Sequence, residues 1–174
     1  MTRRPSTDQG CLEGRAWCFG DHVDTDIIIP VRYCTTSDPE ELGRYAMAGV
    51  DPGFSSRIAP GDFIVAGRNF GCGSSRENAP IALLGAGVGA VVAASFGRIF
   101  HRNAINVGLP IFETPEALAL CEAGHLLRAR VEEGILENLT TGLTLAFAPY
   151  PRQVAQIIEA GGLVEYVRRR LAGR

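Results

Sequence analysis

The segment best suited to chemistry is residues 69–77, which read NFGCGSSRE and combine closely spaced glycines, two adjacent hydroxyls and an arginine. The apolar run 62–66 before it is typical of a buried strand, and the run 79–87 after it is typical of a helix. A glycine-rich loop between a strand and a helix leaves backbone N–H groups free to bind an anion, helped by the positive end of the helix dipole. The pattern therefore predicts an anion-binding site.

Residues 74–77 also match S-x-x-E, the pattern of a helix-capping box. A capping box needs no glycines before it. Arg76 would also lie in the first helical turn, where a cation opposes the dipole at a cost of a few tenths to ~1 kcal/mol. A bound anion would remove this conflict, so we favour an anion site over a cap alone.

A carboxylate fits this site better than a phosphate. The segment lacks the G-K-[ST] ending of an ATP-binding loop, and Arg76 occupies the last position of an otherwise matching G-x-G-x-x-G. An arginine binds a carboxylate through a bidentate fork. Ser74 could act as a base if N–H donors stabilised its alkoxide. Cys72 as a nucleophile is the weaker alternative, because no base among the three histidines can be assigned to it.

A second acidic motif, DTD at residues 24–26, allows two interpretations. It is typical of a turn before a strand, and the β-branched run 27–29 that follows predicts such a strand. Alternatively, its two carboxylates orient Arg76 or Arg32. We keep both interpretations open.

The elements around these motifs alternate between strand and helix. Strands are predicted at 15–19, 27–29, 62–66, 90–94 and 110–113, and helices at 38–47, 79–87, 96–107 (capped by Ser95), 114–123, 151–160 and 163–171. Segments 125–131, 135–139 and 143–147 predict an antiparallel meander. We expect an α/β, three-layer β/β/α domain with a mostly parallel sheet plus this meander. Residues 1–13 would form a flexible N-terminal tail, and residues 14–174 one domain.

Composition excludes several classes of function. A formal net charge of −2 argues against sequence-independent binding of nucleic acid. No apolar run is long enough to span a membrane. The polar start has no secretory signal, so we expect a cytoplasmic protein. The five cysteines are dispersed without C-x-x-C spacing. We therefore expect most of them to be small buried side chains and expect no metal on this chain.

Three ordered motifs resemble the small subunit of 3-isopropylmalate dehydratase, the detached swivel domain of the aconitase superfamily. They are DTDIIIP at 24–30, NFGCGSSRE at 69–77 and RIFHRNAINVGLP at 98–110. The resemblance extends over nearly all of residues 14–171. It implies a swivelling domain like the aconitase C-terminal domain.

The resemblance also implies a heteromeric hydro-lyase that isomerises 2-isopropylmalate to 3-isopropylmalate in leucine biosynthesis by dehydration and rehydration. A large partner subunit would hold the [4Fe–4S] cluster, and this chain would bind no cofactor. Ser74 would be the catalytic base, and the dicarboxylate substrate would contact Gly73, Ser75, Arg76 and Asp26. Without its partner, the chain could self-associate.

Two features leave the substrate open. Asn78 stands where the family usually has a histidine. The segment that tracks substrate choice in the family corresponds here to Tyr33, Cys34, Thr35 and Thr36. It has neither a strongly apolar pair suited to an isopropyl group nor the arginine of homoaconitase-like relatives. The alternatives are the small subunit of a homoaconitase or 2,3-dimethylmalate dehydratase, or a non-catalytic anion-binding module.

Overall fold

A computed structural model describes residues 10–173 of the chain. Residues 1–9, the larger part of the predicted tail, and residue 174 lie outside the described residues. Residues 11–13, which also belong to the predicted tail, begin strand β1 (Cys11–Cys18). Strand β1 therefore starts three residues before the predicted domain boundary.

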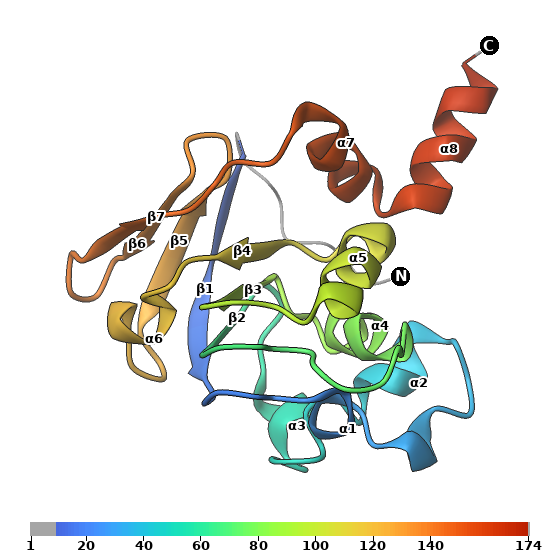
Figure 1. The fold of residues 1–174 in the computed structure, drawn as a ribbon, viewed down its shortest axis with the longest axis horizontal. Coiled ribbons are helices and arrows are strands. Elements are labelled where there is room, and N and C mark those ends of the chain that lie inside the picture. Colours follow the sequence, from blue (N-terminus) through green and yellow to red (C-terminus); the bar gives the residue numbers. More distant parts are fainter. Residues whose placement is uncertain (1–9, 174) are drawn as a thin grey trace.

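The chain forms a seven-stranded sheet in the order β4-β3-β2-β1-β5-β6-β7 (Figure 1). Strands β1, β2 (Phe63–Ala66), β3 (Ala90–Ala93) and β4 (Ile111–Glu113) pair in parallel. Strands β5 (Leu126–Arg130), β6 (Ile135–Asn138) and β7 (Thr144–Ala146) form the antiparallel meander. Because β1 also pairs with β5 in the antiparallel sense, it joins the two halves. The predicted α/β class, with a parallel sheet and a meander, is confirmed.

Helices cover both faces of the sheet. They are α1 (Thr25–Ile28), the 3-10 helix η1 (Val31–Tyr33), α2 (Pro39–Gly43), α3 (Phe54–Arg57), α4 (Asn78–Gly85), α5 (Arg98–Val107), α6 (Ala117–Leu120), α7 (Arg152–Ala160) and α8 (Leu163–Ala172). Figure 1 shows α1 to α5 on one side of the sheet, α6 on the other, and α8 projecting from the body.

Strand β2 shows how one short run supplies two cores. Ile64 and Ala66 pack into a core with α1 to α5, whereas Phe63 and Val65 pack into a second core with α6 and the meander. All four side chains are fully buried. Alternate side chains of a strand point to opposite faces, so a strand covered on both faces is apolar at every position.

The strand predicted at 27–29 is wrong, because this run belongs mostly to helix α1. Asp24 caps the helix, its Oδ1 accepting a hydrogen bond from the Ile27 N–H at 2.8 Å. Ile28 and Ile29 are fully buried in the first core. Burial in that core and the Asp24 cap outweigh the weak β preference of three isoleucines.

Several helices are shorter than their predictions, and the predicted range 114–123 is too long for α6, which spans only Ala117–Leu120. Asp38 and Pro39 begin α2 as expected, but α2 ends at Gly43 and turns follow, in which the Met47 N–H donates to the Ile28 carbonyl. Helix α5 begins at Arg98, not residue 96. Ser95 does not cap it, because the Ser95 Oγ accepts a hydrogen bond from the Asn69 N–H at 2.9 Å. The start of α5 is thereby tied to the segment that leads into the predicted anion site.

Candidate active site

The candidate active site is built on residues 71–77, the site loop, which leads from strand β2 towards helix α4. Gly71 has φ +75°, and a Cβ there would lie 2.2 Å from the ring of Phe100. Gly73 has φ +94°, which side chains rarely adopt. The glycines therefore allow the loop to turn sharply while it packs against α5.

The start of α1 holds the site loop from the other side. The Gly71 N–H donates to the Val23 carbonyl at 2.7 Å, and the Thr25 N–H donates to the Cys72 carbonyl at 2.9 Å. The Thr25 hydroxyl also donates to the Ser74 carbonyl at 3.3 Å, and Thr25 is buried. The DTD motif therefore fixes the backbone on which Ser74 is carried.

The site loop carries several hydrogen-bond donors that have no acceptor in the described part of the chain. Within residues 10–173, no hydrogen bond is made by the N–H groups of residues 73–77 or by the hydroxyls of Ser74 and Ser75. Both serines are exposed. Helix α4 begins at Asn78 with no side-chain cap, so the alternative capping box does not form. Free N–H groups before a helix and an adjacent arginine are what binding of an anion requires.

Arg76 is held in place by Asp26. Its Nη1 lies 2.6 Å from Asp26 Oδ1 and its Nη2 lies 3.2 Å from Asp26 Oδ2, while Nη1 also contacts the Ile29 carbonyl at 3.5 Å. The Arg76 side chain is only 17% exposed. In the described part of the chain nothing accepts from Arg76 Nε, so Nε and the second hydrogen of Nη2 form an edge that can take another carboxylate.

The Asp26–Arg76 pair keeps both groups charged. The hydrogen bond from Arg76 lowers the pKa of Asp26, and the same bond raises the pKa of Arg76. The pair is therefore complete at neutral pH and is lost only as the pH falls through the lowered pKa of Asp26. Asp26 therefore orients the arginine in this structure, while its contact with substrate stays a prediction.

The other members of the acidic motif have different roles. Asp24 caps α1 rather than pairing with an arginine. The guanidinium of Arg32 lies 4.7 Å from the centre of the Tyr33 ring. Of the two interpretations of residues 24–26, the second therefore holds for one residue: Asp26 orients Arg76.

The predicted specificity segment lies beside the site loop. The Thr36 carbonyl accepts a hydrogen bond at 2.9 Å from Asn78 Nδ2, at the first residue of α4. Tyr33 stacks on Tyr45, with ring centres 3.9 Å apart and planes 4° apart, whereas Thr35 is exposed. Sequence reasoning noted Asn78 only as a departure from the family and missed its contact with this segment.

The cysteines near the site are poor nucleophiles. Burial raises the pKa of the Cys72 thiol, and the charge of Asp24 raises it further. Burial also raises the pKa of Cys34, whose sulfur lies 3.9 Å from the Pro30 carbonyl oxygen. Both thiols are therefore protonated near neutral pH, which weakens the alternative of Cys72 as a nucleophile.

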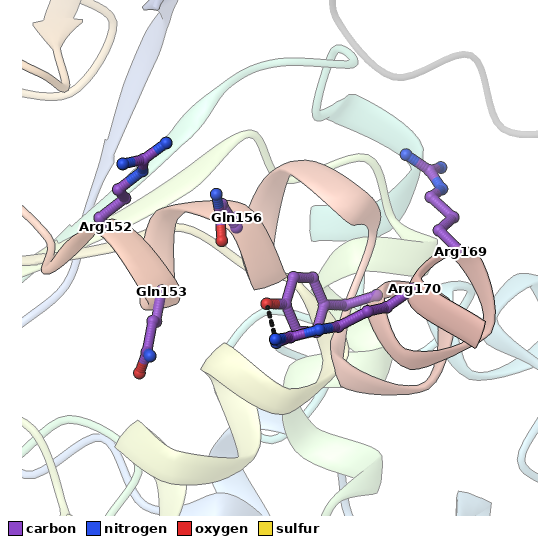
Figure 2. Close-up of a pocket in the computed structure, with 6 residues that line it drawn as sticks. Arg152, Gln153, Gln156, Arg169 and Arg170 are labelled. Carbon is purple, nitrogen blue, oxygen red and sulfur yellow. Dashed lines mark hydrogen bonds between the residues drawn. The ribbon is translucent and has the colours of Figure 1, made fainter. Parts of the chain in front are cut away.

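A hollow of the surface lies between α7 and α8, lined by Arg152, Gln153, Gln156, Tyr166, Arg169 and Arg170. In Figure 2 the Arg170 guanidinium reaches the Tyr166 hydroxyl, to which Nη1 donates at 3.1 Å. None of the predicted site residues borders this hollow. It is therefore separate from the site loop.

Comparison with known proteins places these motifs in a family. The model of the aconitase C-terminal domain matches residues 22–116, a range that holds the DTD motif, the site loop and α5. The 3-isopropylmalate dehydratase small subunit of Moorella thermoacetica is 54% identical over 160 residues, which are 92% of this chain and 96% of that protein. The chain belongs to this small-subunit family. The predicted family is confirmed.

Further similar proteins come from Methanocaldococcus jannaschii. The isopropylmalate/citramalate isomerase small subunit of Methanocaldococcus jannaschii is 49% identical, over 92% of this chain and 96% of that one. A crystal structure of 3-isopropylmalate dehydratase from the same species superposes with a TM-score of 0.87 at 42% identity, covering 93% of this chain and 96% of that one. Within residues 10–173, no helix is long and apolar enough to cross a membrane.

Proposed function

We propose that this chain, with a large partner subunit, isomerises 2-isopropylmalate to 3-isopropylmalate in leucine biosynthesis, in the cytoplasm. The observation that carries the proposal is the site loop, which combines Ser74, free N–H groups and the held guanidinium of Arg76 in a member of the small-subunit family. Such a site suits a dicarboxylate, because one carboxylate can lie on the Arg76 edge while Ser74 reaches the neighbouring carbon.

The chain's own residues carry the proton transfer in this proposal. Ser74 Oγ, as an alkoxide, takes the proton from the carbon next to the bound carboxylate and returns it on rehydration. Negative charge then grows on the carboxylate oxygens, and the N–H groups of residues 73–77 and Arg76 stabilise it more in the transition state than in the ground state. Ser74 is exposed in the isolated chain, so a partner must exclude water before its hydroxyl can become basic.

A [4Fe–4S] cluster on the large subunit completes the proposed enzyme. The residues described here do not fit such a group, because residues 10–173 contain no cluster of three or more His, Cys, Asp or Glu side chains that could hold a metal ion. We therefore assign the ligands of the cluster to the large subunit. The name "small subunit" given to the relatives supports a larger partner.

An assay of the two-subunit complex tests the proposal. The chain and its large subunit are combined without oxygen and offered 2-isopropylmalate, citramalate, homocitrate and 2,3-dimethylmalate. We expect the highest kcat/KM for 2-isopropylmalate and no turnover by either subunit alone. Citramalate is the second candidate, because one relative carries it in its name. Turnover by the isolated chain, or none by the complex, would overturn the proposal, and the latter would favour a non-catalytic anion-binding module.

Asn78 should affect substrate choice through Thr36. In Asn78→Asp the donor to the Thr36 carbonyl becomes an acceptor of similar shape, which removes a hydrogen bond worth ~1 kcal/mol and adds repulsion. We expect KM for the preferred substrate to rise roughly 5- to 10-fold, with kcat little changed and weaker discrimination among the four substrates. Steady-state kinetics with each substrate measures this.

Two variants control this prediction. Asn106→Asp makes the same chemical change at an exposed position in the last turn of α5 and should leave KM unaltered. Asn78→His restores an N–H donor and should recover part of the loss. Equal rises of KM in Asn78→Asp and Asn106→Asp would show that charge, rather than the contact with Thr36, is responsible.

A further inference from the structure

The fold brings together two cysteines that are 103 residues apart in the sequence. The sulfurs of Cys18 and Cys121 lie 3.9 Å from each other, and Cys18 Sγ lies 3.8 Å from the Cys121 carbonyl oxygen. Cys18 is the last residue of β1, and Cys121 follows the last residue of α6. No other two sulfurs are in contact within residues 10–173, where all five cysteines are free.

Both cysteines are held by regular structure. Cys18 pairs with Val65 of the neighbouring strand β2. Cys121 is buried in the second core, and the half-buried Cys18 packs against that core. Because a disulfide needs its sulfurs about 2.05 Å apart, the pair must close by roughly 2 Å. A side-chain rotation at the more exposed Cys18 can supply much of that movement.

We propose that Cys18 and Cys121 form a reversible dithiol–disulfide site that reacts with small disulfides such as oxidised glutathione. The Cys18 thiolate attacks one sulfur of the glutathione disulfide and releases one glutathione thiolate. Cys121 then gives up its proton and attacks the Cys18 sulfur, which releases the second glutathione. The pair loses two electrons and two protons, and the small disulfide gains them as two thiols.

The difference between the two thiols sets the order of these steps. The contact between the two sulfurs does not set the order, because either thiol can donate in it. Cys121 is buried in the second core, which disfavours its thiolate. Cys18 is also the more exposed of the two. Cys18 is therefore the attacking thiol, and Cys121 is the resolving thiol.

Oxidation of the purified chain by glutathione disulfide tests this site. Samples are equilibrated at increasing ratios of oxidised to reduced glutathione, blocked with N-ethylmaleimide and mapped by mass spectrometry. We expect two of the five thiols to be protected and a Cys18–Cys121 peptide to appear. Since the crosslink closes a loop of about 100 residues, the midpoint of thermal unfolding should rise by roughly 10 °C and return after reduction.

Matched serine variants separate the outcomes. Cys18→Ser and Cys121→Ser should each abolish the crosslink and the rise in the unfolding midpoint, whereas Cys11→Ser, which leaves the pair intact, should retain both. A stable glutathione adduct on Cys18 without the crosslink would overturn the proposal, as would a crosslink between other cysteines. The readouts involve neither Ser74 nor turnover, so failure here would leave the proposed function untouched.

Discussion

Replacing Ser74 with alanine should lower the turnover of the two-subunit complex by about 10³-fold or more, within the range that a general base contributes. The fold should not change. The Ser74 hydroxyl makes no hydrogen bond within residues 10–173, and only the backbone carbonyl of Ser74 is used, by Thr25. Steady-state turnover, thermal unfolding and gel filtration of the complex measure these effects together.

Proton exchange gives the decisive readout for Ser74. If the serine is the base, Ser74→Ala should also stop exchange of the substrate C–H with deuterated water, while substrate binding stays near its original strength. Cys72→Ser is the matched control in the same loop and should keep the rate within about threefold, since the raised pKa of Cys72 leaves it protonated. Retention of more than a tenth of turnover in Ser74→Ala would remove serine-base catalysis from the mechanism.

The buried parallel strands were predictable because each one is marked by a local sequence pattern. Residues 63–66 and 90–93 are apolar at every position, as a strand covered on both faces must be. A glycine, Gly61 or Gly89, stands shortly before each run. The glycine-rich turn before α4 was equally visible, since glycines at 71 and 73 permit conformations closed to other residues. Local chemistry alone therefore located the candidate site loop.

The strand predicted at residues 27–29 failed for a tertiary reason. Three β-branched residues prefer extended backbone by only a small free energy, and burial of Ile28 and Ile29 among α2, α4 and β2 decides the conformation instead. The capping box, which was the less favoured interpretation of residues 74–77, does not form either. Residues 74–77 match the S-x-x-E pattern, but α4 starts at Asn78. The Thr25 hydroxyl donates a hydrogen bond to the Ser74 carbonyl.

Contacts between distant residues were the least accessible to sequence reasoning. The sequence suggested that an acidic motif orients an arginine, but not which carboxylate pairs with which arginine. The structure pairs Asp26 with Arg76, 50 residues apart. Nothing in the spacing of the cysteines joins Cys18 to Cys121, because they meet only when α6 packs beneath the sheet. Such pairs depend on topology, which no local pattern encodes.

Replacing Arg76 with lysine should raise KM for the dicarboxylate by about 100-fold. The guanidinium offers one edge to Asp26 while the Nε edge stays free for the substrate. A lysine keeps the charge but has a single nitrogen, so it cannot hold Asp26 and a substrate carboxylate in two bidentate pairs. Because the same carboxylate gains charge in the transition state, kcat should fall as well. Steady-state kinetics of the assembled complex measures both parameters.

The chain offers a matched control for Arg76→Lys. Arg68 also pairs with one aspartate, its Nε and Nη2 donating to Asp21 Oδ2 at 3.2 and 3.0 Å, but its side chain is 72% exposed and is not part of the site loop. Arg68→Lys should therefore leave KM within about threefold, because an exposed ion pair contributes little. Asp26→Asn keeps the guanidinium but removes its anchor, so it should raise KM about tenfold. Equal KM values in Arg76→Lys and Arg68→Lys would mean that Arg76 does not bind the substrate.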